Sequence, residues 1–332
     1  IIVCRKLLIT RTPYRISFLG GGTDYPQWYL DNTGVVISSS INKFSYITLN
    51  KLDKFYNYSY RIRYYYREEA KNINQIKHPT IKNTLNFYKL KDGYDIFHYG
   101  ELPARTGIAS SSSFTVGLVH GINYLKSKKI DKKKILFDSI HIEQDLNKEN
   151  IGSQDQVATC FGGFNCIEFN NKNIKINNLK RFKKNISKIE SSCLLFYSGK
   201  QRESFKITKD LVSNIKLNNK YFENIKSLTY DALNLIKSKN FDVNYFGEIV
   251  KESWYNKNTI SRKYSNEKIN NLFKDSIKYG AKGFKMLGAG SEGFFIIIAN
   301  KKDHNKIVKR YKKFLNINFK FENEGSKIIY EN

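Results

Sequence analysis

Residues 102–114 read Leu102-Pro-Ala-Arg-Thr-Gly-Ile-Ala-Ser-Ser-Ser-Ser-Phe114, a loop of small residues that runs directly into a helical pattern. In that pattern, apolar residues recur at helical spacing at Phe114, Leu118, Ile122 and Leu125. Small residues let a backbone approach an anion, and free N–H groups and the dipole at a helix N-terminus favour phosphate. The loop matches neither GxxxxGK[ST] nor GxGxxG, so phosphate binding and an ordinary serine-rich N-cap are both open at this point.

Two further glycine-rich loops lie on either side of this one in the sequence. Residues 18–26 read Phe18-Leu-Gly-Gly-Gly-Thr-Asp-Tyr-Pro26 and follow a strand-like run that contains Arg15. Three glycines permit close approach to a ligand, Thr23 and Asp24 suit sugar hydroxyls, and an arginine suits phosphate. Residues 285–294 read Lys285-Met-Leu-Gly-Ala-Gly-Ser-Glu-Gly-Phe294, a hairpin or a strand–helix junction before a buried strand. Alone, this third loop indicates only tight packing.

Composition narrows the class of protein. The chain has 332 residues, 40% hydrophobic and 14% aromatic, which is enough to bury a sizeable core and excludes global disorder. No apolar run approaches the ~18 residues that span a bilayer, and we find no secretory signal. Four scattered cysteines without a CxxC pair indicate reduced thiols, and five scattered histidines form no zinc motif. We therefore expect a cytoplasmic protein with no membrane partner.

The charge is strongly basic. Lys and Arg number 57 and Asp and Glu 30, giving a formal net charge of +27. Such an excess can indicate nucleic acid, anionic lipid or phosphorylated substrates. The basic residues are mostly spread out, and the clusters at 126–134 and 180–184 lie in expected connections. Residues 56–67 (YNYSYRIRYYYR) suit either base stacking or a strand, and we favour the strand and expect no nucleic-acid partner.

The order of elements predicts an α+β protein, because mixed strands are followed by helices. Strands are expected at 7–19, 35–37, 44–49, 95–100, 164–169, 193–197 and 293–299, with 35–37 paired to 44–49. Helices are expected from the serine-rich loop, from an N-cap at Asp131 to about residue 147, over most of 203–279 with breaks near 239–242 and 261–265, and at 303–315.

Together the three loops resemble the motifs of the GHMP kinases, the superfamily of galactokinase, homoserine kinase, mevalonate kinase and phosphomevalonate kinase. Residues 103–112 resemble the signature P-x-x-x-G-L-G-S-S-A, and residues 288–290 resemble the start of the C-terminal G-A-G-G-G. Three residues depart from these motifs. Ala109 replaces the second glycine of the signature, which is tolerable if its φ is negative, and Ser291 and Glu292 replace later glycines.

The resemblance implies two α+β domains with the active site between them. The first, residues 1–187, is expected to resemble domain 2 of ribosomal protein S5 and to hold the ATP, magnesium and catalytic residues. The second, residues 188–332, is expected to be ferredoxin-like.

The resemblance also implies the site residues. Asp155, within Asn150-Ile-Gly-Ser-Gln-Asp-Gln156, would act as the catalytic base on the acceptor hydroxyl. Arg15 would stabilise the transferred phosphoryl group and keep Asp155 ionised. Ser111 and Glu143 would bind Mg²⁺, which prefers hard oxygen ligands. The implied ATP-binding residues are Pro103, Gly107, Ala109, Ser110, Ser111 and Ser112. The implied substrate-binding residues are Gly21, Gly22, Thr23, Asp24, Arg202, Gly288, Ala289 and Gly290, and Arg105 and Lys285 are further candidates for a substrate phosphate.

Within the superfamily, Gly21 and Gly22 stand where galactokinases carry a Glu-His pair. With the serines at 110–113 and the Gly-x-x-Arg turn ending at Arg202, this resembles the kinases of D-glycero-D-manno-heptose 7-phosphate. The resemblance implies an ATP-dependent kinase, monomeric or homodimeric, that phosphorylates O1 of this sugar for nucleotide-activated heptose used in surface polysaccharide. The alternatives are another sugar-1-kinase, for fucose or galactose, a basic RNA-binding protein with the S5-like fold, and a non-catalytic family member.

Overall fold

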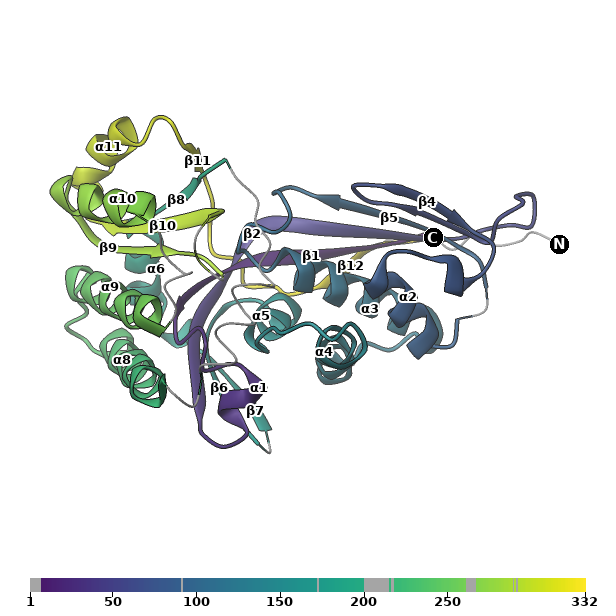
Figure 1. The fold of residues 1–332 in the computed structure, drawn as a ribbon, viewed down its shortest axis with the longest axis horizontal. Helices are drawn as coiled ribbons and strands as arrows, with labels where there is room; N and C mark the ends of the chain where they lie inside the picture. Colours follow the sequence, from purple (N-terminus) through teal and green to yellow (C-terminus); the bar gives the residue numbers. More distant parts are fainter. Residues whose placement is uncertain are drawn as a thin grey trace.

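Two sheets organise the chain into an N-terminal and a C-terminal lobe, as the computed structural model shows (Figure 1). The structure describes residues 7–90, 92–171, 173–199, 215, 218–260, 267–288, 290 and 292–332. The combination of helices with mostly antiparallel sheets confirms the predicted α+β class.

The N-terminal lobe is built on an eight-stranded sheet. Its main path runs β12 (Lys327–Glu331), β1 (Leu7–Leu19), β2 (Gly34–Lys51), β5 (Tyr94–Gly100), β3 (Tyr60–Arg63) and β4 (Arg67–Ala70). Two further strands extend from β2, namely β6 (Phe164–Asn170) and β7 (Asn173–Asn178). β3 and β4 pair as a hairpin, so the stretch 56–67 contributes one short strand, its turn and the start of the next strand.

The predicted pairing of 35–37 with 44–49 is wrong, because both segments belong to the single 18-residue strand β2. The intervening residues 38–41 stay extended since they pair with β1. Residues 34–39 also pair with β6 on the other side. The serines in this stretch are buried between two neighbouring strands rather than placed in a turn.

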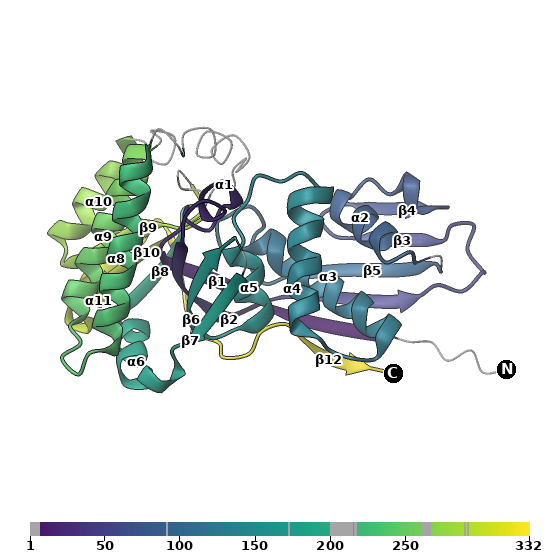
Figure 2. The same cartoon turned by 90° about the horizontal axis from the view of Figure 1, so that it is seen from below.

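Helices cover one face of this sheet (Figure 2). They are α2 (Pro79–Phe87), α3 (Ser110–Ser127), α4 (Lys132–His141) and α5 (Gln154–Phe161), with the short helices α1 (Pro26–Tyr29) and η1 (Ile73–Gln75) and the π-helical turn η2 (Ile142–Leu146). Alternate residues of the strands, such as Ile47 and Ile96, share a buried core with Val116 and Leu118 of α3. Asp131 caps α4 as predicted, accepting hydrogen bonds from the N–H groups of Lys133 and Lys134.

The C-terminal lobe has a four-stranded sheet in the order β11 (Leu315–Ile317), β8 (Cys193–Tyr197), β10 (Phe294–Ala299) and β9 (Ala281–Met286). Its helices are η3 (Lys180–Phe182), α6 (Lys183–Ser192), α8 (Asn219–Lys237), α9 (Val243–Ile260), α10 (Glu267–Lys278) and α11 (Lys301–Arg310). β9 and β10 are antiparallel neighbours, so the third glycine-rich loop is a hairpin connection.

The two lobes share structure. One buried apolar cluster combines Phe18 and Val35 of the first sheet with Leu195, Phe294 and Phe246 of the C-terminal lobe. The chain also returns at its end, since β12 pairs with β1. The predicted division at 187/188 falls within α6 and stays a prediction.

Two further predictions concern the class of protein. Among the described residues, no helix combines the length and the hydrophobicity that crossing a membrane demands. The described cysteines Cys160, Cys166 and Cys193 are buried and free. Burial raises the pKa of each of these thiols, which favours the neutral form.

Candidate active site

The serine-rich loop ends at the N-terminus of α3, where Ala109 is the N-cap residue. Ala109 has a φ of 62° and Gly107 a φ of 91°. Ala109 therefore does not meet the condition of a negative φ under which alanine is tolerated at this position. A left-handed conformation costs an L-residue about 1–2 kcal/mol, so the loop holds strain where it turns into the helix. The turn leaves the first N–H groups of α3 at the start of the loop's serine run, which is the arrangement that binds phosphate in other helices.

Glu143 lies in the turn η2, and its carboxylate is fully buried against α3. It accepts hydrogen bonds from Ser111 Oγ at 3.2 Å, Ser112 Oγ at 2.9 Å and Thr115 Oγ1 at 2.9 Å, and from the side-chain amide of Gln156. Burial raises the pKa of Glu143, and the neighbouring Glu149 carboxylate raises it further. The structure thus brings together Ser111 and Glu143, the two residues expected to bind magnesium.

Arg15 and Asp155 form an ion pair. Arg15 Nη2 lies 2.6 Å and Nε 2.8 Å from Asp155 Oδ1. Nη1 of Arg15 also donates to the carbonyl of Gly107 at 2.8 Å, so the same guanidinium contacts the serine-rich loop. The Arg15 side chain is 3% exposed and that of Asp155 is 25% exposed. The arginine is therefore fixed in the interior while the carboxylate keeps an accessible side for an acceptor.

Asp24 connects the first glycine-rich loop to α5. Its carboxylate accepts from the N–H of Gly22 at 2.8 Å and of Gln154 at 3.4 Å. Burial raises the pKa of Asp24, the Gly22 N–H opposes this, and the Asp155 charge raises it. A Cβ on Gly152 would lie 1.8 Å from Asp24 Oδ2, so only glycine fits at that position.

The Thr23 side chain forms its hydrogen bonds within the protein, to Gly20 of the first glycine-rich loop and to Val35 of β2. Its buried hydroxyl has one hydrogen to donate, with the carbonyl oxygens of Gly20 and Val35 in reach at 2.8 and 3.0 Å, and it accepts from the Val35 N–H at 3.0 Å. These bonds use its donor and one lone pair inside the fold, which argues against the sugar contact expected for Thr23.

The serine-rich loop and the third glycine-rich loop, residues 285–294, pack backbone to backbone. A Cβ on Gly107 would lie 2.4 Å from the Leu287 carbonyl oxygen, and the Phe294 N–H donates to the Thr106 carbonyl at 2.9 Å. Gly288 and Gly290 both have positive φ, of 62° and 79°. The expected substrate residues Ala289 and Arg202 lie outside the described residues.

Comparison with known proteins identifies this arrangement. Residues 74–163 match the model of the GHMP kinases N terminal domain, and residues 232–317 match that of the GHMP kinases C terminal domain. Together the two matches cover about half of the chain. The chain belongs to the GHMP kinases. It is therefore a phosphotransferase, and the family predicted from the three loops is confirmed.

Relatives of this GHMP kinase span nearly its whole length. D-glycero-alpha-D-manno-heptose 7-phosphate kinase of Campylobacter jejuni is 27% identical, with 97% of this chain and 98% of the relative covered. Galactokinase of Pyrococcus furiosus is 25% identical, with 89% of each chain covered. A crystal structure described as a D-glycero-D-manno-heptose 1-phosphate kinase from Bacteriodes thetaiotaomicron has a TM-score of 0.78 at 21% identity, covering 97% of this chain and 99% of that one. This last likeness shows the shared fold.

The remaining candidates of the GHMP kinase lie at the margins of the site. Pro103 accepts from Thr106 Oγ1 at 2.7 Å, and Ser110 Oγ accepts from the Arg105 N–H at 3.1 Å, so both shape the serine-rich loop. Arg105 itself is exposed. Lys285 is buried, and its ammonium group donates to the Phe18 carbonyl at 2.8 Å, behind the first glycine-rich loop.

Sequence reasoning missed three side chains of the site: Thr115, Gln156 and Lys257. Thr115 follows Ser111 by four residues, and this helical spacing could have placed both on the face that contacts Glu143. No local pattern placed Gln156 beside that carboxylate. Lys257 comes from α9 of the other lobe and donates to the Gly288 carbonyl at 3.1 Å.

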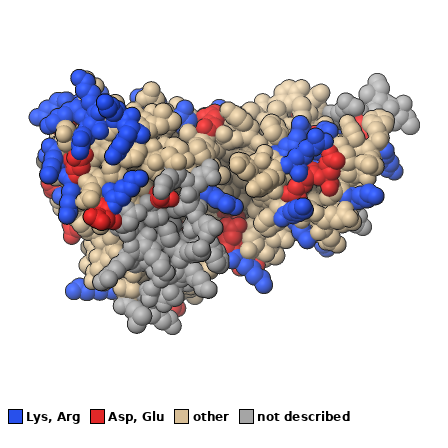
Figure 3. Space-filling model, turned by 45° about the horizontal axis from the view of Figure 1, so that its top comes forward, with Lys and Arg blue, Asp and Glu red and all other residues tan. Residues whose placement is uncertain are grey.

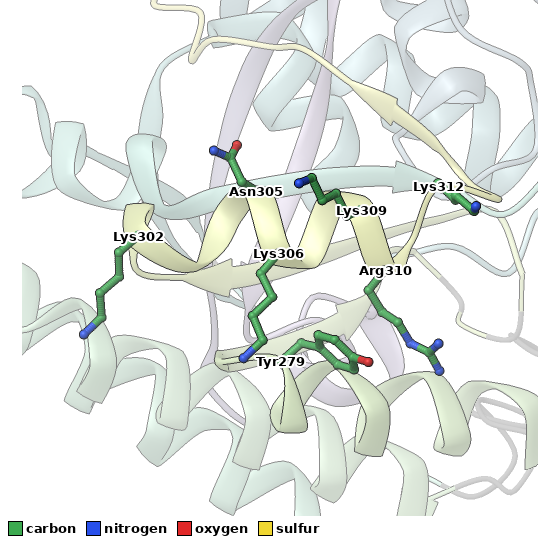
Figure 4. Close-up of a pocket in the computed structure, with 7 residues that line it drawn as sticks. All are labelled: Tyr279, Lys302, Asn305, Lys306, Lys309, Arg310 and Lys312. Atoms are coloured by element: carbon green, nitrogen blue, oxygen red, sulfur yellow. The ribbon is translucent and has the colours of Figure 1, made fainter.

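A basic hollow of about 630 Å³ lies elsewhere on the GHMP kinase, along α11 (Figure 4). Figure 3 shows Lys and Arg crowded over this end of the C-terminal lobe. Arg310 is paired with Asp275 at 2.8 Å, and Lys306 and Arg310 lie over the Tyr279 ring. No site residue comes from α11. Among the described residues, no group of three His, Cys, Asp or Glu side chains is placed to hold a metal ion.

Proposed function

We propose that this GHMP kinase transfers the γ-phosphoryl group of ATP to the anomeric hydroxyl O1 of D-glycero-D-manno-heptose 7-phosphate, giving the 1,7-bisphosphate. GHMP kinases use ATP as phosphate donor. The 1,7-bisphosphate would serve nucleotide-activated heptose for surface polysaccharide. Cytoplasmic location and a monomeric or homodimeric state belong to the same proposal.

The observation that supports this acceptor is the absence of a side chain at the buried Gly21. A Cβ placed there would be in ordinary van der Waals contact, at 3.6–3.7 Å, with the polar ends of three side chains. A galactokinase-like site fills this position with a glutamate, whereas glycine leaves these polar ends free of such a side chain, for contact with a seven-carbon sugar. The full-length similarity to a heptose 7-phosphate kinase supports the same acceptor.

The chemistry follows from the ion pair. Asp155 would accept the O1 proton as O1 bonds to the γ-phosphorus and the bond to the bridging oxygen of ADP breaks. Arg15 would stabilise the charge on the transferred phosphoryl group while it orients Asp155. Because Arg15 also bonds to the Gly107 carbonyl, it fixes the distance between the base and the phosphate-binding loop.

The residues fit a magnesium ion. Ser111 and Glu143 present a hydroxyl and a carboxylate oxygen within 3.2 Å of each other, and Mg²⁺ takes few protein oxygens and keeps several waters. These two residues would hold the ion, which supplies neutralisation of phosphate charge when bound.

Replacement of the two ligands tests this assignment. Ser111→Ala and Glu143→Gln should each raise the Mg²⁺ concentration needed for half-maximal activity by about 10-fold or more, since each removes an oxygen ligand of the ion. Ser113→Ala is the matched control, because the Ser113 hydroxyl donates to the Pro13 carbonyl away from the carboxylate. Unchanged magnesium dependence in both ligand variants would show that the ion binds elsewhere.

The product tests the function itself. After incubation with ATP and heptose 7-phosphate, phosphorus NMR should show a second phosphate coupled to the anomeric proton. A new phosphate on another carbon would refute the O1 assignment. Phosphorylation of fucose or galactose in place of the heptose would support the alternative sugar-1-kinase.

A further inference from the structure

Three polar side chains surround the position that a Cβ on Gly21 would occupy. From the site of a Cβ on Gly21, Lys257 Nζ and Gln154 Nε2 lie at 3.6 Å and Ser17 Oγ at 3.7 Å. They come from β1, α5 and α9, so both lobes contribute. Their polar ends converge on one small volume beside Asp24, whose carboxylate contacts the Gly22 and Gln154 N–H groups.

Two of these side chains each have a buried polar atom without a hydrogen-bond partner among the described residues. Ser17 is 4% exposed and Gln154 is 7% exposed. Ser17 Oγ and Gln154 Oε1 are both buried without a partner among the described residues. Leaving a buried polar group without a hydrogen bond is unfavourable, so such groups are expected to meet a ligand. Hydroxyl groups of a sugar supply the donors that the Gln154 carbonyl oxygen and the Ser17 hydroxyl accept.

Lys257 adds a positive charge to this volume. Its ammonium group donates to the Gly288 carbonyl, which places it between the first and third glycine-rich loops. Lys285 lies near enough to Lys257, Arg15 and Asp24 to interact electrostatically with each of them. Burial lowers the pKa of Lys285 well below its ordinary range, and the charges of Lys257 and Arg15 lower it further. The Asp24 carboxylate opposes this by raising the pKa of Lys285, and an anion that enters beside Lys257 would offset the repulsion between the cations further.

We propose that Lys257 binds the phosphate group of the acceptor, while Ser17 and Gln154 hydrogen-bond to its hydroxyls. Lys257 then sets the preference for a phosphorylated over a neutral sugar. This inference rests on the proposed function, since it assigns the part of that acceptor which each side chain contacts. It also explains why residue 21 is a glycine, because a larger side chain there would contact the three polar groups that we assign to the acceptor.

Acceptor kinetics of Lys257→Met test the proposal. We compare kcat/KM for heptose 7-phosphate with kcat/KM for unphosphorylated heptose, in the wild type and in the variant. The ratio should fall about 10- to 100-fold, mainly through KM for the phosphorylated sugar, because a charge-assisted bond to phosphate is lost. Lys257→Arg should restore part of the ratio. Lys251→Met, on the same helix, is the matched control for loss of a lysine from α9.

The outcomes separate this inference from the function on which it rests. If Lys257→Met leaves the ratio of the two kcat/KM values unchanged, because both acceptors lose equally or neither loses, the role of Lys257 is overturned. In that case a preference of the wild type for heptose 7-phosphate still upholds the proposed function. A wild type that uses neither heptose but phosphorylates another sugar overturns both. Ser17→Ala and Gln154→Met should lower kcat/KM for both heptoses alike, and a loss confined to the phosphorylated one contradicts their assignment to hydroxyls.

Discussion

Arg15 is the residue on which the site geometry depends, because one guanidinium contacts both Asp155 and the Gly107 carbonyl. The sequence placed Arg15 and Asp155 in one site only through the resemblance to a family, since they are 140 residues apart. Their ion pair follows from how β1 passes beneath the start of α5, which no local pattern describes. The burial of Glu143 could not be predicted locally either, because a single glutamate without a visible partner is expected at the surface. Four hydrogen-bond donors from α3 and α5 make its burial possible.

Replacing the proposed base tests the reaction at the residue scale. Asp155→Asn should lower kcat by about 100-fold or more, because the amide cannot accept the O1 proton. The amide oxygen can still accept from Arg15, so nucleotide affinity, measured by calorimetry, should change little. Wild-type turnover in this variant would remove Asp155 from the catalytic role.

Ala109 permits a second test at the same scale. Ala109→Gly should raise the free energy of unfolding by up to about 1 kcal/mol, because glycine adopts a φ of 62° without the cost that a Cβ imposes. Urea denaturation measures the change. Ala104→Gly is the control: Ala104 is not among the residues with positive φ, so glycine there should only destabilise the fold through greater freedom of the unfolded chain. A less stable Ala109→Gly protein contradicts this account of strain.

At the scale of elements, the sequence predicted those whose own pattern is strong. β1 and β8 match their predicted ranges, and α3 begins in the serine-rich loop as expected. The sequence failed for β2, because burial between two neighbours keeps a serine run extended against its local preference for a turn. The helix expected from Asp131 to about residue 147 covers both α4 and η2, but a π-helical turn has no periodicity of its own that would have distinguished it from the helix before it.

Contacts between α3 and the end of the chain predict an acid sensitivity. His120 on α3 contacts Ser326 Oγ through Nδ1 at 3.0 Å, just before β12, and burial lowers the pKa of His120 to about 4. Because the folded-state pKa lies below the ordinary 6.5, the stability from neutral His120 is present above pH 6.5 and is lost as pH falls toward 4.

His120→Gln checks this sign, since glutamine does not titrate and can keep the bond to Ser326. Urea midpoints should fall less between pH 7 and pH 5 in the variant than in the wild type. The same pH dependence in both proteins would mean that His120 does not contribute to the loss of stability in acid.

At the scale of the molecule, the three glycine-rich loops meet because the lobes share a core. Phe18 and Phe294 belong to one buried cluster, and each lies at the edge of a glycine-rich loop. Packing of Gly107 against the Leu287 carbonyl then fixes the serine-rich loop to the hairpin of the other lobe. The resemblance to the family implied a site between two lobes. It could not show that Lys257 enters the site from α9, because no motif surrounds that lysine.

Acceptor specificity of the wild-type protein tests the central claim most directly. With ATP and Mg²⁺ saturating, we expect kcat/KM for heptose 7-phosphate to exceed that for unphosphorylated heptose and for galactose by about 10- to 100-fold, the value of a charge-assisted contact to one phosphate. The measurement is a coupled assay of ADP release over the three acceptors. An equal or higher kcat/KM for galactose would contradict the role given to Gly21 and leave the family of the enzyme unchanged.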